Sequence, residues 1–437
     1  MSGKTLRFIA LLCGALLLGG CASNSPSPDP SPDPSPSPNQ ITVASPDPVL
    51  TEPSPEEAPS PLPDVPYVID EGPTEAMIAE SRLAEGNKVR LAEKLKKAQA
   101  GGDFTVAYIG GSITQGSSAG PETCYSALVT DWFETTFPNA AVQYVNAGIG
   151  ATGSYIGVHR ADGDVLAKNP DIVFVEFSVN DTTENTERNI NSYDSLLRKL
   201  WLSPSAPALV AVATTQESGN SFQAQHAEIA AAYDLPFVSY RNAILYVIDK
   251  GYIVWDDISD DDIHPNVTGH KVLSELIISY LEGVNAELDA ISGEESDFSV
   301  PHTDDKYQNA RLIRLGDESV TSLGMFEENT TNFGNFAGTW RATVEGEVSG
   351  LVFEVEAKNI AVFFGKLTKD GGLFEVIIDG EQTAIVDTSF PGGWGNYVEV
   401  TEVASYEEPG AHTVEIRPVV PEDGAAARLY ISSLAVS

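Results

Sequence analysis

A serine on a glycine turn is the first residue of this chain whose surroundings suggest chemistry. Ser112 stands in Gly-Gly-Ser and follows the apolar run 105–109, whose β-branched residues predict a buried strand. The two glycines let the backbone turn sharply, so the serine hydroxyl would lie exposed at the carboxyl end of the strand. Such a hydroxyl is a nucleophile when a neighbouring base takes its proton. The alternative for this stretch is a serine that only caps the next helix.

A histidine later in the chain supplies a candidate base. His264 stands in Asp-Asp-Asp-Ile-His-Pro-Asn, and Asp261 precedes it by three residues. On a turn this spacing lets the carboxylate accept a hydrogen bond from Nδ1–H, which fixes the tautomer and leaves Nε2 for the serine. Asp261 is selected on spacing among several acidic neighbours, and a solvated loop histidine is the alternative. Pro265 disfavours helix at His264, as expected for a loop before the final helix.

Acyl transfer also needs hydrogen-bond donors for the oxyanion. Asn180 follows the apolar strand predicted at 172–177, and the glycine-rich stretch 146–154 follows another strand. The carboxyl ends of neighbouring parallel strands meet at one crevice, so both segments would face the serine. The Asn180 amide and a backbone N–H at Gly150 or Ala151 are therefore candidate donors. The alternatives are a helix cap at Asn180 and an ordinary loop at 146–154. A phosphate-binding loop is not indicated, because no lysine follows the glycines.

Strands and helices alternate around these residues, which predicts the fold class. Residues 74–100 have helical apolar spacing, begin at Thr74 as N-cap and end at two glycines. Alternation of this kind predicts an α/β fold in which helices cover a parallel sheet. The predicted strands are 105–109, 142–146, 172–177, 208–214 and 237–239, and the later predicted helices are 125–137, 189–201, 222–233 and 267–281.

The pattern changes near residue 293. Beyond it helical periodicity is almost absent, and short apolar runs are separated by turn signals such as Asp-Gly and Pro-Gly. These features predict an all-β sandwich of jelly-roll type. Trp340, Trp394 and Tyr397 are candidates for stacking on sugars, with packing in the sandwich core as the alternative.

Four sequence blocks together resemble the SGNH, or GDSL-type, hydrolases. They are the serine in Gly-Gly-Ser, a glycine in a following loop, the asparagine in Val-Asn-Asp, and Asp-x-x-His near the end of the α/β part. The resemblance implies a three-layer α/β/α fold and ester hydrolysis by a serine triad without a metal or other cofactor. It makes Ser112 the nucleophile, His264 the general base and acid, and Asp261 the residue that orients the histidine. The oxyanion donors would be the Ser112 N–H, a loop N–H and the Asn180 side chain.

The chain departs from the family pattern in two places. The first block reads Gly-Gly-Ser-Ile where Gly-Asp-Ser-Leu is usual, so the acidic residue before the nucleophile is missing. In the second block both Gly150 and Ala151 fit the oxyanion position, and a backbone donor tolerates either. Arg160 resembles a family position that supports the site, with pairing to one of the many acids as the alternative.

The amino-acid sequences of the blocks resemble those of the carbohydrate-esterase branch of the family. Gly-Gly-Ser-Ile-Thr-Gln-Gly and Asp-Ile-His-Pro-Asn are similar to its motifs, and its members remove acetyl groups from plant polysaccharides, several with a sugar-binding β-sandwich. We therefore expect a serine esterase that removes O-acetyl groups from a xylan- or mannan-like polysaccharide. The alternatives are a lipid or short-chain esterase and a non-catalytic glycan-binding surface lipoprotein.

The N-terminus carries an export signal. Lys4 and Arg7 precede an apolar segment too short to span a bilayer, and Leu-Gly-Gly-Cys follows it. This order resembles a bacterial lipoprotein signal, so we expect residues 1–20 to be removed and Cys21 to carry the lipid. The mature protein would be anchored to a membrane and exposed outside the cytoplasm.

Composition sets the remaining domain boundaries. Residues 21–68 are dominated by Ser-Pro-Asp-Pro repeats, which predict a disordered spacer prone to polyproline II structure. The hydrolase domain would occupy 69–292 and the β-sandwich domain 293–437.

The charge of the chain restricts its partners. The formal net charge is −38 at pH 7, which excludes nucleic acid as a partner and disfavours docking on an anionic membrane other than through the lipid anchor. An acetylated polysaccharide carries no charge that would be repelled, so it remains compatible with this surface.

Overall fold

The computed structural model describes residues 65–182, 186–333, 336–422 and 424–437. The predicted signal peptide, the lipidated Cys21 and most of the predicted spacer lie outside the described residues. Within the described part of the chain, no helix has both the length and the apolar character needed to cross a bilayer.

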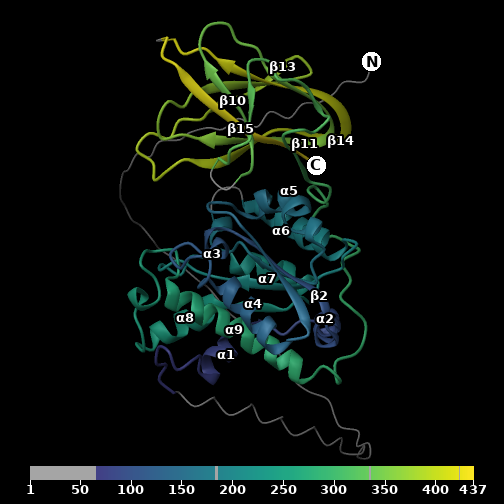
Figure 1. Ribbon diagram of the computed structural model, residues 1–437, viewed down its shortest axis with the longest axis vertical. Helices are drawn as coiled ribbons and strands as arrows, with labels where there is room; N and C mark the ends of the chain where they lie inside the picture. The colour runs from purple at the N-terminus through teal and green to yellow at the C-terminus, as the bar shows by residue number, and fades with distance from the viewer. Residues whose placement is uncertain (1–64, 183–185, 334–335, 423) are drawn as a thin grey trace, which may run out of the picture. The chain divides into compact units, whose positions relative to one another are not determined.

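A mostly parallel sheet forms the centre of the first domain (Figure 1). In spatial order its six strands are β1 (Arg82–Ala84), β6 (Phe237–Ser239), β5 (Ala208–Ala213), β4 (Ile172–Glu176), β2 (Gly102–Gly110) and β3 (Ala140–Gly148). All neighbours pair in parallel except β1, which is antiparallel to β6 at the edge. β2 therefore lies inside the sheet, and its carboxyl end leads directly to Ser112.

Helices cover both faces of this sheet. Along β2, Val106 and Tyr108 belong to one apolar cluster and Ala107 and Ile109 to the other, because alternate residues of a strand face opposite sides. The first cluster includes residues of α1 (Glu75–Ser81), α2 (Val89–Ala100), α4 (Tyr125–Thr136), α8 (Tyr240–Asp249) and α9 (Val267–Ala286), and the second includes residues of α5 (Ser154–Asp164), α6 (Thr186–Trp201) and α7 (Gln223–Ala232). The predicted three-layer α/β/α fold is confirmed.

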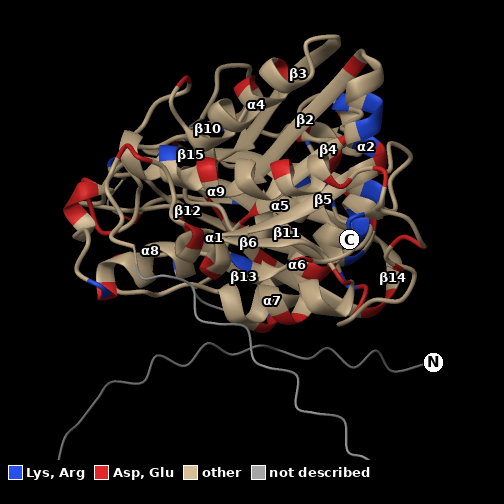
Figure 2. Cartoon of the chain, turned by 90° about the horizontal axis from the view of Figure 1, so that it is seen from below, with Lys and Arg blue, Asp and Glu red and all other residues tan. Residues whose placement is uncertain are grey.

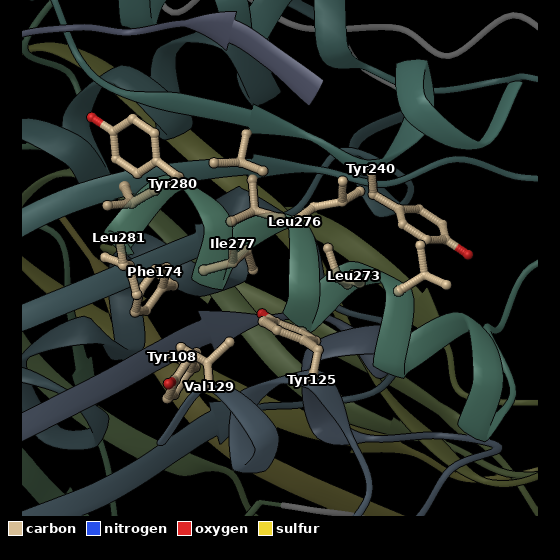
Figure 3. Packing of buried hydrophobic residues seen from close by; sticks show 14 of the residues in the cluster. Tyr108, Tyr125, Val129, Phe174, Tyr240, Leu273, Leu276, Ile277, Tyr280 and Leu281 are labelled. Atoms are coloured by element: carbon tan, nitrogen blue, oxygen red, sulfur yellow. The ribbon is translucent and has the colours of Figure 1, made fainter. Parts of the chain in front are cut away.

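Figure 3 shows how α9 packs on the sheet. Leu273, Ile277 and Leu281 recur at a spacing of four residues, so they lie on one face of the helix and are fully buried. That face meets the side chains of Tyr108 and Phe174, whose rings stack with centroids 5.0 Å apart. Each buried leucine or isoleucine contributes roughly 1.5–3 kcal/mol, so this contact holds α9, the helix that follows the histidine loop, against the sheet.

The first helix differs from its prediction. Residues 74–100 form two helices, α1 and α2, with β1 between them, rather than one. Thr74 does cap α1, since its Oγ1 accepts the Met77 N–H at 3.3 Å. The chain turns at Gly86, which has a φ of 60°, and a Cβ there would lie 2.2 Å from Pro236 N. The predicted spacer boundary is also wrong at its end, because Tyr67 is buried in the first apolar cluster.

The second domain is all-β, as predicted. Its strands are β7 (Arg311–Ile313), β8 (Val320–Ser322), β9 (Glu327–Asn329), β10 (Thr339–Val344), β11 (Leu351–Lys366), β12 (Leu373–Ile378), β13 (Glu381–Asp387), β14 (Tyr397–Val419) and β15 (Ala427–Val436). They pair in antiparallel fashion in the order β13-β12-β14-β11-β15-β10-β9, with β7 beside β15 and β8 beside β11. β11 and β14 are longer than the predicted runs because they continue through bulges near residues 357–361.

Trp340 lies in the core of this domain. It is fully buried on β10, and its ring meets Phe353 edge to face with centroids 5.4 Å apart. The prediction that Trp340 stacks on sugars is therefore wrong, because a side chain without exposed surface cannot contact a ligand.

The segment between α9 and β7 packs on the first domain. Arg198 Nε on α6 donates to Phe298 O at 3.0 Å, and the Thr303 N–H donates to Asp194 Oδ2 at 2.7 Å. Phe298 and Tyr307 are both buried in the second apolar cluster. The β-sandwich therefore begins at β7 rather than at the predicted residue 293.

Acidic residues are spread over the helices and loops of the described chain, whereas basic residues gather along α2 (Figure 2). Part of this positive charge is matched within the chain. Lys97 Nζ is 2.7 Å from Asp171 Oδ1, and Arg90 pairs with Glu295. Acidic side chains of the same chain therefore neutralise part of the positive charge of α2.

Candidate active site

The end of β2 and the loop before α9 bring three predicted residues together. Ser112 begins the short helix α3 (Ser112–Gln115), and His264 lies between η3 (Trp255–Asp257) and α9. His264 Nε2 is 2.9 Å from Ser112 Oγ, and His264 Nδ1 is 2.8 Å from Asp261 Oδ2. A serine nucleophile needs a base within hydrogen-bond reach, and the base needs an acid that orients it. This hydrogen-bonded chain provides both contacts.

Asp261 also organises the backbone of the histidine loop. Its Oδ1 accepts the N–H groups of Ile263 at 2.7 Å and His264 at 2.6 Å, which closes an Asx turn. Partial burial raises the pKa of the Asp261 carboxyl, but the hydrogen bonds from His264 and from the Ile263 N–H outweigh it, so the pKa lies below its usual value. The acid therefore stays ionised and can accept from the imidazole.

The glycines before Ser112 are required by close packing. A Cβ added to Gly111 would lie 2.0 Å from Asn180 Oδ1, and one added to Gly110 would lie 2.4 Å from Glu176 O. Neither glycine has a positive φ, so space rather than backbone conformation excludes a side chain. The same contact shows that Asn180, in η2 (Asn180–Thr182), lies directly beside the nucleophile turn.

The loop after β3 places Gly150 and Ala151 at the same cavity as Ser112. Ala151 has a φ of 59°, a left-handed conformation that is uncommon for a residue with a Cβ. The Gly150 N–H donates to Gln115 Oε1 at 2.7 Å. Within the described residues the structure records no acceptor for the Ala151 N–H. Of the two loop donors that the sequence left open, Ala151 is the one not already engaged.

Arg160 supports the nucleophile turn from the interior. Its Nη2 donates to Gly110 O at 3.0 Å and its Nη1 to Ala147 O at 2.6 Å, so one guanidinium joins the ends of β2 and β3. Burial lowers the pKa of Arg160, against the effect of Asp164, whose Oδ2 is 3.2 Å from Nη1. Asp164 also forms an ion pair with Arg314 of the second domain, at 3.4 Å. The guanidinium is thus held by two carbonyls and one carboxylate.

Glu176 is a fully buried acid at the end of β4. Its carboxylate accepts hydrogen bonds from the hydroxyls of Thr214 at 2.8 Å, Ser178 at 3.3 Å and Thr114 at 3.4 Å. Burial raises the pKa of Glu176 to about 7, although the three hydroxyls act in the opposite direction. The acid connects β5 to the helix turn that carries the nucleophile.

A buried histidine–aspartate pair was not predicted from the sequence. His226 Nε2 lies 2.9 Å from Asp181 Oδ2, and both side chains are fully buried. Asp181 Oδ1 also accepts the Ser154 N–H at 2.8 Å, so it joins the Asn180 turn to the start of α5. The two partners are 45 residues apart in the chain, so only knowledge of the packing could have linked them.

Ser112, His264 and Asn180 line a cavity of about 690 Å³ whose other lining residues come from both domains. The second domain contributes Phe336, Trp394, Asn396 and Tyr397. Trp394 is 71% exposed, and its ring lies over Tyr397 with centroids 5.0 Å apart. Two of the three predicted stacking residues therefore lie at the cavity. Among the described residues, no group of His, Cys, Asp and Glu is arranged to hold a metal ion.

Known proteins resemble the chain in sequence and in fold. The family model described as GDSL-like lipase/acylhydrolase matches residues 108–272. An acetylxylan esterase from Geobacillus stearothermophilus is 24% identical over 203 residues, which are 39% of this chain and 90% of that protein.

Two crystal structures match both domains. One is a two-domain esterase active on acetylated mannans, 34% identical, with a TM-score of 0.76 over 82% of this chain and 98% of that chain. The other is a two-domain esterase co-crystallised with mannopentaose, 33% identical, with a TM-score of 0.74 over 82% and 97% of the two chains. With this match and the residues of the family model in place, the chain belongs to the GDSL-like lipase/acylhydrolase family and is a carboxylic ester hydrolase with a second, all-β domain.

Proposed function

We propose that the protein is a serine esterase that removes O-acetyl groups from a xylan- or mannan-like polysaccharide. The observation that carries the proposal is the hydrogen-bonded chain Asp261–His264–Ser112 at the wall of a cavity with an exposed Trp394. The likeness over both domains to an esterase active on acetylated mannans supports the substrate class. The acetylxylan esterase supports the same reaction on a different backbone.

In the proposed reaction Ser112 Oγ attacks the acetyl carbonyl carbon while His264 Nε2 takes the hydroxyl proton. The Ser112 N–H, the Ala151 N–H and the Asn180 amide would hold the negative charge on the carbonyl oxygen. Ionised Asp261 stabilises the imidazolium that forms.

The tetrahedral intermediate collapses when His264 gives its proton to the departing sugar oxygen, which leaves the acetyl group on Ser112. His264 then deprotonates a water, which attacks the acetyl carbonyl. Acetate leaves as the serine recovers its proton. No step requires a group other than these side chains and water.

A second cavity supports a polymeric substrate. It has a volume of about 350 Å³, is lined by residues of the second domain, and shares Asn396 with the first cavity. Amide and hydroxyl groups at its wall, including Asn329, Thr331 and Thr368, suit the hydroxyls of a sugar. Sugar units beyond the acetylated one would extend past Trp394 and Asn396 into this cavity.

Acetate release by the purified protein tests the proposal. The substrates are acetylated mannan, acetylated xylan, and 4-nitrophenyl esters with short and long acyl chains. We expect acetate from at least one polysaccharide. Replacing Trp394 by alanine should raise KM for that polysaccharide by about 5-fold, since one aromatic contact is worth roughly 1 kcal/mol. Turnover of 4-nitrophenyl acetate should stay within about twofold, because this ester has no sugar to stack.

Ile385→Ala is the matched control, because Ile385 is 61% exposed and does not line either cavity. Hydrolysis of long-chain esters alone would replace the proposal with a lipid esterase. A protein that binds polysaccharide but hydrolyses no ester would replace it with a glycan-binding lipoprotein.

We also propose that the protein is a lipoprotein anchored through Cys21 and exposed outside the cytoplasm. The charged, apolar and Leu-Gly-Gly-Cys segments at the N-terminus support this location. Cells fed an alkyne-tagged fatty acid should label the wild-type chain and Cys13→Ser but not Cys21→Ser. An unlabelled wild-type chain in the soluble fraction would refute the anchor.

A further inference from the structure

Gln115 is a cavity residue whose side chain has a defined orientation. It is the last residue of α3, one helical turn after Ser112, and it lines the same cavity. Its side-chain oxygen lies 2.7 Å from Gly150 N. Because a backbone N–H can only donate, the facing atom must be Oε1, and Nε2 must be the other end of the carboxamide.

The Nε2 group carries two N–H donors that face no acceptor in the part of the chain that the structure describes. Within the described residues the structure records no hydrogen bond from Gln115 Nε2. The side chain is half-buried at the cavity wall. Turning the carboxamide by half a rotation would place Nε2 against the Gly150 N–H, donor against donor. The contact with Gly150 therefore holds the two donors in place, and fixed polar groups of this kind orient ligands in pockets.

The carboxamide lies close to the nucleophile. A Cβ added to Gly150 would lie 2.9 Å from Gln115 Oε1 and 3.8 Å from Ser112 Cβ. Gln115, Gly150 and Ser112 are therefore mutual neighbours. A ligand group that hydrogen-bonds to Gln115 Nε2 would therefore lie close to an ester seated on Ser112, and the sugar unit that carries this ester brings hydroxyl groups to that place.

We infer that Gln115 is a specificity-determining residue whose Nε2 donates a hydrogen bond to a hydroxyl oxygen of the acetylated sugar. This inference rests on the proposed function, since it names how the same site recognises the alcohol side of its ester. Gln115 makes and breaks no bond in the reaction. Its oxygen engages the Gly150 N–H, which leaves the Ala151 N–H as the loop donor for the oxyanion.

Two substitutions separate the donor from the acceptor of this side chain. Gln115→Met keeps the length but removes both functions, whereas Gln115→Glu keeps an acceptor for the Gly150 N–H and removes the Nε2 donors. The readout is the ratio of kcat/KM for the preferred acetylated oligosaccharide to kcat/KM for 4-nitrophenyl acetate, which has no sugar hydroxyl. A charge effect of the glutamate on the oxyanion acts on both substrates and cancels in this ratio.

We expect the ratio to fall by about 3- to 10-fold in both variants, as for one neutral hydrogen bond to the substrate. The loss should lie mainly in KM for the oligosaccharide. Gln382→Met is the matched control, because Gln382 is exposed on β13 and lines neither cavity, and its ratio should stay within about twofold of the wild type.

An unchanged ratio in Gln115→Met would overturn the inference while the esterase assignment stands. A fall in Gln115→Met but not in Gln115→Glu would also overturn it, because the acceptor alone would then suffice. Wild-type protein that cleaves 4-nitrophenyl acetate but releases no acetate from any oligosaccharide would overturn the proposed function, and this inference with it.

Discussion

Replacing Ser112 by alanine is expected to lower kcat for acetate release by about 10⁴-fold or more, because the proposed acetyl-enzyme forms on the Ser112 hydroxyl. The Ser112 hydroxyl is the atom that His264 Nε2 contacts at 2.9 Å. Its removal leaves the Gly110–Gly111 turn unchanged, so the protein should remain folded. Acetate release and thermal unfolding are measured on the same preparation.

Ser292→Ala is the control, since it removes a hydroxyl at an exposed position that lines neither cavity. It should keep nearly all of the activity. A Ser112→Ala variant that retained more than about one per cent of kcat would contradict covalent catalysis. Hydrolysis would then proceed by direct attack of a water on the ester.

Replacing Glu176 by glutamine is expected to make stability less sensitive to pH between about 4.5 and 7. The pKa of Glu176 in the folded chain is about 7, against an ordinary value of 4.5. Below pH 4.5 both states hold the proton and the carboxyl contributes nothing to the pH dependence. As the pH rises, the unfolded chain loses this proton first, so the free energy of unfolding falls until about pH 7. The difference between the two pKa values corresponds to about 3 kcal/mol.

Urea unfolding of wild type and Glu176→Gln across pH 4 to 8 measures this effect. Other titrating groups are common to both proteins, so they cancel in the difference. That difference should move in favour of the variant by up to about 3 kcal/mol as the pH rises. Glu122→Gln, at an exposed position, should follow the wild type throughout. Parallel curves for Glu176→Gln and the wild type would show that folding does not shift the pKa of this carboxyl, which would contradict the prediction.

The parts of the site that depend on neighbours in sequence were predictable. Asp261 and His264 are three residues apart, and one Asx turn is enough to bring their side chains together. The two glycines indicated the nucleophile turn in the sequence. The structure shows that a side chain is excluded there by close contact with Asn180 and Glu176, not by a special backbone conformation.

Contacts between distant segments were not predictable. Gln115 accepts from Gly150, 35 residues later in the chain, and nothing near either residue indicates the other. The pairing of His226 with Asp181 likewise needs α7 to lie beside the Asn180 turn. Neither pair has a sequence motif of its own.

The local sequence around Trp340 and Trp394 distinguishes a core tryptophan from an exposed one. Trp340 stands in Thr-Trp-Arg-Ala-Thr-Val, where alternate residues of β10 are buried. Trp394 stands in Gly-Gly-Trp-Gly, a turn sequence between β13 and β14. Alternation predicts a core residue for the first and an exposed loop residue for the second. In the same way, Gly86-Asn87 was a turn signal inside the region taken as one helix.

The cavity is lined by segments that lie almost 300 residues apart in the chain. Ser112 and Asn180 lie in the first domain. Trp394, in the loop before β14, and Tyr397, the first residue of β14, lie in the second domain, and all four residues line this cavity. Under the proposed function, substitutions in that loop would change which polymer is held without disturbing Ser112, His264 and Asp261. The reaction and its selectivity would then be separately mutable, because their residues lie in different domains.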